Sequence, residues 1–429
     1  MRTMVLRGGT LIDGASPQQQ TDIVVTEGNI TAVAPAGTVA DAGGGILDVT
    51  GLLVMPGLVD IQVHFREPGG TDAEDIESGA QGAARGGMTA VVLMPNTTPP
   101  VDGVDVVGQV MAIARHALID VRTSATLSRG REGHQVVDFD ALYGAGVRVF
   151  TDDGNALMDS ALMRAALQAT TRLPGMVVSQ HAEDEALVAG GVINEGATAQ
   201  ALGVRGRPAE AEEVIVARDV ALARLTGGRY HVLHLSSRLS LRHVARARRE
   251  GLAVTCEVTP QHLALTEEDV PRLGTNGKMN PPLRTAADVA ALRAGLADGT
   301  IQAVATDHAP HSPARKAASL ADAPPGMLGT ETAASVIWTH LVIPGMLTPS
   351  QAVQVLSVNP AGIAGLEEHG GPIRAGRPAN LCVFDPAHEW VVDVDTLASK
   401  SRNSPFAGET LTGRPVMTLY NGRTVHDLM

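Results

Sequence analysis

Several histidine and aspartate residues stand directly after short apolar runs, at positions far apart in the sequence. His64, His181 and His234 each follow such a run, as do Asp307 and the pair Asp152-Asp153. Imidazole and carboxylate groups together suit zinc or another first-row divalent metal, and a catalytic zinc site keeps one position open for water. Water on such a metal has a pKa of about 7, and a neighbouring carboxylate can accept its proton and pass it to a leaving group. The residue types therefore predict a metal-dependent hydrolase, provided that the fold brings them together.

The elements that would position these residues alternate between apolar runs and alanine-rich stretches of helical character. Eight runs typical of buried strands lie at residues 58–63, 89–93, 121–127, 147–150, 176–179, 230–235, 252–258 and 301–305. Strands that alternate with helices form right-handed parallel βαβ units, and eight of them in about 300 residues fit a (β/α)8 TIM barrel in the α/β class. A barrel gathers the C-terminal ends of its strands on one face, so the candidate ligands would meet in one polar ring.

The two ends of the chain are built differently, from short β-type runs separated by Gly, Asn and Asp. The runs lie at residues 4–7, 22–25 and 30–33 near the start and at 379–385, 389–392 and 416–420 near the end. Neither end has enough apolar residues for a core of its own. We therefore expect residues 1–55 and 366–429 to pair into one small β-sandwich domain, and residues 56–365 to form the metal-dependent catalytic barrel.

The overall composition is that of a globular protein. Of the 429 residues, 44% are hydrophobic and 18% are charged, which excludes a disordered chain. The net charge of −13 argues against nucleic acid and anionic membrane as partners. No apolar run of about 18 residues is present, and the first residues do not form a signal-peptide pattern. Cys256 and Cys382 are the only cysteines, so a reducing cytoplasm fits better than a disulfide framework.

Seven short motifs occur in a fixed order along the chain and can be compared with those of known families. They are Gly57–Gly69, Met94–Thr97, Phe150–Gly154, His181–Glu183, Met279–Arg284, Ala305–His311, and Gly326 ahead of Gly329–Thr332. Together these motifs resemble the amidohydrolase superfamily and, within it, the dihydroorotases of the bacterial type I class. The resemblance implies reversible, zinc-dependent hydrolysis of the cyclic amide of (S)-dihydroorotate to N-carbamoyl-L-aspartate in pyrimidine biosynthesis. It also implies a homo-oligomer, expected to be a dimer, and aspartate carbamoyltransferase as a possible partner.

The same resemblance implies how the metal would be held. His181 and His234 would hold one zinc ion, and His64 would help to hold a second. Asp153 would bridge the two metals, although its neighbour Asp152 remains an alternative ligand. Asp307 would contact metal and act first as the general base and then as the general acid on the ring nitrogen.

The substrate contacts implied by the resemblance form a second group. Arg66, Asn96 and His311 would bind the substrate carboxylate, and His64 would also contact the substrate. A planar guanidinium suits this role because it can bind a carboxylate through two parallel hydrogen bonds. The ring amide groups would be contacted by residues of two later segments, namely Asn280, Pro325 and Gly326.

One position departs from the family pattern. The first strand normally ends in His-x-His, but this chain reads Gln62-Val63-His64. A glutamine carbonyl is neutral and a poor zinc ligand, so the metal held by this pair should be weak or absent. The site formed by Asp153, His181 and His234 needs nothing from Gln62. The enzyme could therefore use one zinc ion, or two with Gln62 as a weak ligand or acting through water.

Two other functions stay open. The chain could be a non-catalytic, dihydroorotase-like partner of aspartate carbamoyltransferase, but chains of that kind usually lose several ligands and substrate contacts together. It could also be a hydantoinase or allantoinase, which share the barrel and act on cyclic amides. Those enzymes normally carry a carboxylated lysine on strand four, where this chain has residues 149–153 without a lysine. The elements His64-x-Arg66 and Asn280-Pro281-Pro282 favour an acidic pyrimidine substrate, and we favour an active dihydroorotase.

Overall fold

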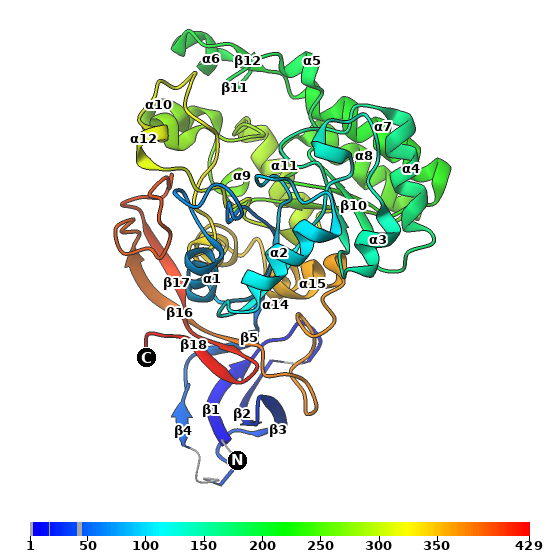
Figure 1. Ribbon diagram of the computed structural model, residues 1–429. Coiled ribbons are helices and arrows are strands. Elements are labelled where there is room, and N and C mark those ends of the chain that lie inside the picture. The colour runs from blue at the N-terminus through cyan, green and yellow to red at the C-terminus, as the bar shows by residue number, and fades with distance from the viewer. Residues whose placement is uncertain (1–2, 17, 41–44) are drawn as a thin grey trace.

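Eight parallel strands close into a barrel. The computed structural model, drawn in Figure 1, describes residues 3–16, 18–40 and 45–429. The strands are β6 (Leu58–Val63), β7 (Met88–Leu93), β8 (Asp120–Thr123), β9 (Val149–Phe150), β10 (Val177–Gln180), β13 (Tyr230–Val232), β14 (Val254–Val258) and β15 (Ala303–Val304). They form sheets in the orders β6-β7-β8 and β9-β10-β13-β14-β15. Parallel bridges from Ala125 to Phe150 and from Val63 to His308 join these sheets at both edges. The predicted (β/α)8 barrel is therefore confirmed.

Helices follow the barrel strands and cover their outer faces. The main ones are α1 (Ile76–Arg85), α2 (Val104–Ala114), α3 (Phe139–Gly144), α4 (Ser160–Thr170), α7 (Glu210–Thr226), α8 (Arg238–Arg249) and α11 (Ala286–Ala297). Side-chain N-caps fix where several of them begin, because Asp75, Asp159, Ser237 and Thr285 each accept a hydrogen bond from a free backbone N–H of the first turn. The rest of the barrel sequence supplies α13 (Ala333–Ile337), α14 (Pro349–Val353) and α15 (Asn359–Ala364), with π-helical turns at Trp338–Val342 and Gln354–Val358.

Shorter elements decorate the C-terminal side of the barrel. Between β10 and α7 the chain makes a long excursion that contains α5 (Glu185–Val188), β11 (Ile193–Asn194), α6 (Ala197–Leu202) and β12 (Gly206–Arg207). This excursion lies at the top of the view in Figure 1. The other short elements are α9 (Pro260–Ala264), α10 (Val270–Leu273), α12 (Pro313–Lys316), and 3-10 turns at Arg129–Arg131, Glu267–Asp269 and Gly274–Gly277.

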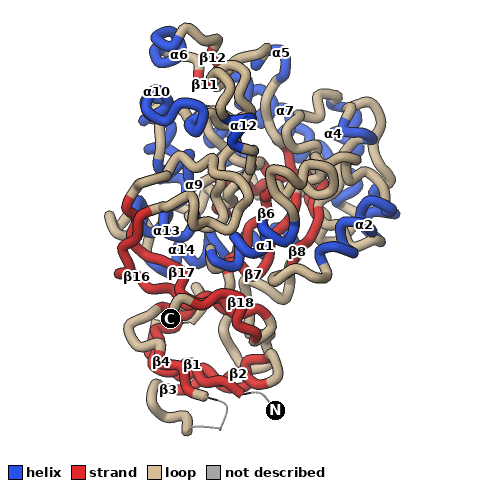
Figure 2. The backbone as a smooth tube through the Cα atoms, turned by 60° about the vertical axis from the view of Figure 1, so that its left-hand side comes forward, coloured by secondary structure: helices blue, strands red, loops and turns tan. Residues whose placement is uncertain are grey.

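The two ends of the chain share one eight-stranded sheet. Its strands are β1 (Thr3–Leu11), β2 (Gln19–Thr26), β3 (Asn29–Pro35), β4 (Ile46–Asp48), β5 (Leu53–Pro56), β16 (Leu381–Val391), β17 (Thr410–Tyr420) and β18 (Arg423–Asp427). The order is β18-β17-β16-β5-β1-β2-β3, and β4 pairs with β1. Figure 2 shows the sheet curling round on itself below the barrel. Leu6 and Ile23 share a hydrophobic core with Leu381 and Leu419. The domain boundaries after residues 55 and 365 remain a prediction.

The interior of the barrel is a packed core. Val59, Ile61, Val92, Leu233 and Ala303 belong to one buried apolar cluster within it. Side chains therefore fill the barrel below its C-terminal face, where the polar residues gather, as is usual for this fold. In the ranges that the structure describes, no helix combines the length and the apolar character needed to cross a bilayer.

Candidate metal centre and active site

One cavity of about 190 Å³ brings the predicted metal and substrate residues together. Its lining includes His64, Arg66, Asn96, Asp153, His181, His234, Asn280, Asp307, His311, Pro325 and Gly326. Most of them follow the C-terminal ends of barrel strands, from β6 to β15. Three of the residues other than glycine, Arg66, His234 and Asp307, have positive φ angles of 60°, 31° and 50°. Such backbone geometry is uncommon for residues other than glycine and tends to occur at functional sites.

Asp153, His181 and His234 form the group best placed to hold a metal ion. One ligand atom from each lies within 4.8 Å of the others, and all three residues are buried. His181 Nδ1 is 2.9 Å from His234 Nε2, and His234 Nε2 is 3.4 Å from Asp153 Oδ1. Two imidazole nitrogens and a carboxylate oxygen are donor atoms that zinc prefers. The donor set and its spacing therefore fit a first-row divalent metal ion.

Glu183 fixes the orientation of His181. The carboxylate accepts a hydrogen bond of 3.2 Å from His181 Nε2, so Nδ1 is the nitrogen that faces Asp153 and His234. Burial alone would raise the pKa of Glu183, but the hydrogen bond and charge of His181, followed by the charges of Arg207 and Arg284, outweigh burial and lower it to about 2. A carboxylate behind a metal-binding histidine is a common way to fix the ring and its tautomer. Glu183 is part of the motif His181–Glu183, but the sequence alone did not predict that it would orient His181.

Asp152 is used by the surrounding backbone. Its carboxylate accepts hydrogen bonds from the backbone N–H groups of Leu127 at 2.8 Å and Ser128 at 3.1 Å, and from the Ser128 hydroxyl at 2.5 Å. Asp153 instead faces the imidazoles. The geometry thus favours Asp153 as the ligand of the two.

Gln62 lies against the metal ligands as a hydrogen-bond donor. Its Nε2 donates to Asp153 Oδ1 at 3.2 Å. The other amide atom, Oε1, is buried without a hydrogen-bond partner among the described residues. Since the amide presents N–H hydrogens to Asp153, the carbonyl is not turned toward that carboxylate.

His64 lies between two carboxylates. Its Nδ1 donates to Asn96 Oδ1 at 2.9 Å, while Nε2 is 3.0 Å from Asp307 Oδ1 and 3.3 Å from Asp153 Oδ2. Carboxylate oxygens are acceptors only, so a proton or a cation must lie between Nε2 and these oxygens. The arrangement links Asp307 through His64 to Asp153 of the metal group.

Arg66 and Asn96 present donors to the cavity. Arg66 donates its Nε hydrogen to the backbone oxygen of Pro310 at 3.3 Å, which leaves its terminal nitrogens for a ligand. Burial lowers the pKa of Arg66 to about 10, which still leaves the guanidinium charged at neutral pH. Because Asn96 Oδ1 accepts from His64, its amide N–H groups remain for a ligand. Both side chains can therefore bind an anionic group.

His311 also lines the cavity, but it has no hydrogen free to donate to a substrate carboxylate. Its Nε2 hydrogen is donated to the backbone oxygen of Pro325 at 2.8 Å. Burial and the nearby charge of Arg66 lower the pKa of His311 to about 3, so the ring is neutral at pH 7. Its remaining nitrogen is an acceptor, and donation to a carboxylate requires the bond to Pro325 to open.

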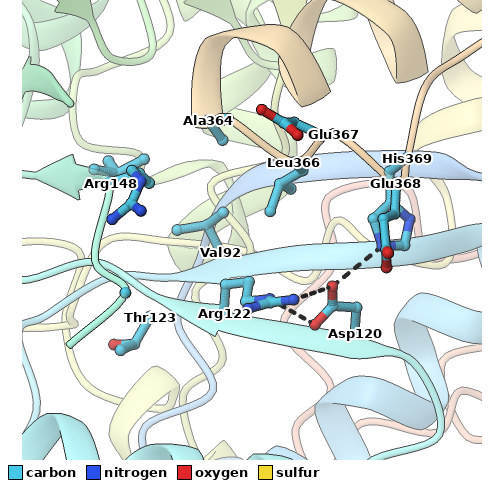
Figure 3. Close-up of a pocket in the computed structure, with 13 residues that line it drawn as sticks. Val92, Asp120, Arg122, Thr123, Arg148, Ala364, Leu366, Glu367, Glu368 and His369 are labelled. Carbon is cyan, nitrogen blue, oxygen red and sulfur yellow. Dashed lines mark hydrogen bonds and ion pairs between the residues drawn. The ribbon is translucent and has the colours of Figure 1, made fainter. Parts of the chain in front are cut away.

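A second cavity, of about 220 Å³, lies apart from these residues, beside β8, β9 and the loop after α15 (Figure 3). Three of its charged or titratable side chains are paired with one another. Arg122 donates to both oxygens of Asp120 at 2.8 and 3.1 Å, and His369 Nε2 lies 3.2 Å from the same carboxylate. None of the predicted site residues lines this cavity.

Comparison with known proteins identifies the family. The sequence matches the families described as Dihydro-orotase-like over residues 51–240 and Amidohydrolase family over residues 148–426. A dihydroorotase of Pelotomaculum thermopropionicum is 44% identical, with 98% of each chain covered. A dihydroorotase of Aquifex aeolicus is 40% identical, with 99% of this chain and 100% of the relative covered.

Solved structures support the same fold. The L-hydantoinase (dihydropyrimidinase) of Arthrobacter aurescens superposes with a TM-score of 0.89 at 25% identity, covering 100% of this chain and 96% of that chain. A dihydropyrimidinase of Brevibacillus agri gives a TM-score of 0.83 at 23% identity, covering 99% and 95%, and shows the fold alone. Given relatives of such identity over nearly its whole length, the chain belongs to the dihydroorotase family of amidohydrolases.

Proposed function

We propose that this protein is a dihydroorotase, which interconverts (S)-dihydroorotate and N-carbamoyl-L-aspartate in de novo pyrimidine biosynthesis. The observation that carries the proposal is the meeting of two kinds of group in one cavity. Arg66 and Asn96 supply donors for a carboxylate, and Asp307 lines the same cavity as the candidate metal group, to which His64 connects it. Relatives that bear the name dihydroorotase along the full length of the chain support the same activity.

We propose zinc at Asp153, His181 and His234 as the cofactor. Bound there, zinc supplies Lewis-acid chemistry, because it polarises a carbonyl group and lowers the pKa of water. The buried carboxylate of Glu183 supports this choice, since it holds His181 with Nδ1 turned toward the site. Gln62 acts as a donor to Asp153 rather than as a ligand, so we propose one zinc ion per chain.

The protein's own side chains divide the remaining work. Arg66 and Asn96 bind the substrate carboxylate and thereby orient the ring over the site. Asp307 accepts the proton released by the attacking water and returns it to the ring nitrogen as the amide bond breaks. The side chain of Asp307 is 13% exposed and lies 3.0 Å from His64 Nε2, so it is close to the reacting groups and still reachable from the cavity.

The test is a kinetic assay on purified protein. Zinc-loaded protein should convert dihydroorotate to carbamoyl-aspartate and back, and a chelator should abolish both directions. Hydantoin and dihydrouracil, which lack the carboxylate that Arg66 would bind, should react at least about 100-fold more slowly, because a desolvated guanidinium is left unpaired. Faster turnover of these neutral rings than of dihydroorotate would replace the proposal by a hydantoinase activity.

Gln62 supports one rival, a non-catalytic partner of aspartate carbamoyltransferase. Protein that binds such a transferase but turns over neither compound with zinc, manganese or cobalt would establish this role instead. The measurement is turnover in parallel with co-sedimentation of the purified transferase.

We further propose a cytoplasmic, dimeric enzyme. Cys256 and Cys382 are both buried free thiols, which is consistent with a reducing compartment. Sedimentation of the purified chain tests the dimer.

A further inference from the structure

Arg207 lies next to the metal group although it comes from a distant excursion of the chain. It ends β12, which pairs with β11 so that Arg207 is opposite Asn194. Arg284, which is buried, donates through its guanidinium to Asn194 Oδ1 at 2.9 Å and to the backbone oxygen of Arg207 at 3.0 Å. These contacts hold the excursion against the barrel and place the Arg207 side chain at the edge of the active-site cavity.

The guanidinium of Arg207 connects two residues that both touch His181. Its Nε donates to the backbone oxygen of Gly191 at 2.6 Å, which fixes the plane of the group. One terminal nitrogen then donates to Glu183 Oε2 at 3.1 Å and also to Asn280 Oδ1. With its side chain only 14% exposed, Arg207 is held in one orientation.

These bonds determine which atoms Asn280 offers to the cavity that it lines. Its Oδ1 is occupied by Arg207, so Asn280 Nδ2 is turned the other way and lies 3.5 Å from His181 Nε2. That nitrogen already carries the hydrogen donated to Glu183 and has no lone pair to accept another. The two N–H hydrogens of Asn280 therefore lack an acceptor on His181 and are left for a ligand.

We infer that Arg207 is a positioning residue that makes Asn280 a pure hydrogen-bond donor and thereby selects ligands with a carbonyl oxygen at this point. If Arg207 were absent, the amide of Asn280 could rotate and present its own oxygen, which would repel a carbonyl. The inference rests on the proposed dihydroorotase function, because the ring amide of that substrate supplies the carbonyl. Arg207 itself does not need to touch the substrate.

Steady-state kinetics of five variants, with zinc content and thermal midpoint, test this role. Arg207→Met should raise KM about tenfold in both directions while kcat stays within about twofold, because a ligand hydrogen bond is lost. Arg207→Lys, which keeps the charge but reaches only one partner, should lie between. Arg205→Met, an exposed arginine of the same segment, is the matched control and should equal the native protein. In an Asn280→Ala background, Arg207→Met should raise KM by less than about twofold further.

Several outcomes would overturn the inference. An equal rise in KM in both backgrounds would show that Arg207 does not act through Asn280. Loss of zinc or a lower thermal midpoint in Arg207→Met, with a fall in kcat, would show a structural role through Glu183. Native turnover with an unchanged KM in Arg207→Met would refute the inference and leave the proposed function intact.

An inactive native protein would instead refute the proposed function. Calorimetric Kd values for dihydroorotate, measured on the same variants, would then decide the role of Arg207. A tenfold weaker Kd in Arg207→Met that disappears in the Asn280→Ala background supports it, and the absence of any binding counts against both ideas.

Discussion

Replacing Gln62 by histidine restores the second imidazole of the first strand and should raise the zinc content from one ion to two. Gln62 and His64 are two residues apart at the end of β6, and both reach Asp153, at 3.2 and 3.3 Å. The substitution removes a hydrogen bond to a charged group, worth about 1.5–3 kcal/mol, and also removes a buried oxygen whose missing partner costs about 1–3 kcal/mol. These two effects nearly cancel, so the folded chain should tolerate the change.

The gain should appear in the metal-bound state. A second ion at a free concentration of about 100 times its Kd would stabilise the protein by about 2.7 kcal/mol. Gln62→His should therefore show a second zinc ion by elemental analysis and a zinc-dependent rise in thermal midpoint beyond that of the native chain. Gln62→Met is the matched control, because it keeps the size of the side chain and supplies neither donor nor nitrogen ligand.

The control also tests the proposed donor role. Gln62→Met should still bind one zinc ion, but with an affinity about tenfold lower, since losing a group that orients a ligand typically costs 10–100-fold in metal affinity. Two zinc ions in the native chain would refute this account of Gln62. One zinc ion bound with the same affinity by the native chain, Gln62→Met and Gln62→His would also refute it.

Three further predictions concern neighbouring carboxylates. Asp307→Asn should lower kcat by about 10²–10⁴-fold while one zinc ion is retained, as measured by turnover and elemental analysis. Asp152→Asn should destabilise the fold by about 1–3 kcal/mol in urea unfolding with kcat nearly unchanged, because an amide replaces one acceptor oxygen that the backbone and Ser128 use. Burial raises the pKa of Glu257 to about 8, above its value in the unfolded chain, so the native state holds the extra proton and loses stability as pH rises from about 4.5 to 8. Glu257→Gln should flatten this loss, seen as a smaller difference in thermal midpoint between pH 5 and pH 8. An unchanged pH profile would contradict the assignment.

The barrel was predictable because its strands are apolar runs that must be buried on both faces. The predicted C-terminal ends of the strands were less accurate where the following residues belong to the active site. The run at residues 230–235 was expected to be one strand, but β13 ends at Val232. His234 has a φ of 31°, which a strand does not allow, and this turn points the imidazole toward Asp153. Residue type alone does not reveal such a local conformation.

The ring of candidate residues followed from strand order, but the contacts that orient them did not. Arg207 ends the last short strand of the excursion that begins after Glu183, and the contact between the two residues at 3.1 Å depends on how that excursion folds back. For His311, the place in the site was predicted from the sequence, but its hydrogen bond to the backbone oxygen of Pro325 was not. Hydrogen-bond direction decides whether a side chain donates or accepts, and it is set by tertiary neighbours rather than by spacing.

The energetics of the site favour an enzyme over a non-catalytic scaffold. Asp153, His181 and Glu183 are all buried, and Arg284 lies 3.9 Å from Glu183 with one nitrogen that lacks a hydrogen-bond partner among the described residues. Buried ionic groups of this kind are often less stabilising than apolar side chains of similar size. A chain that served only to bind a partner would fold at least as well without them. Because Gln62 alters one ligand and still hydrogen-bonds Asp153, the remaining polar cluster is better explained by chemistry at a single metal ion.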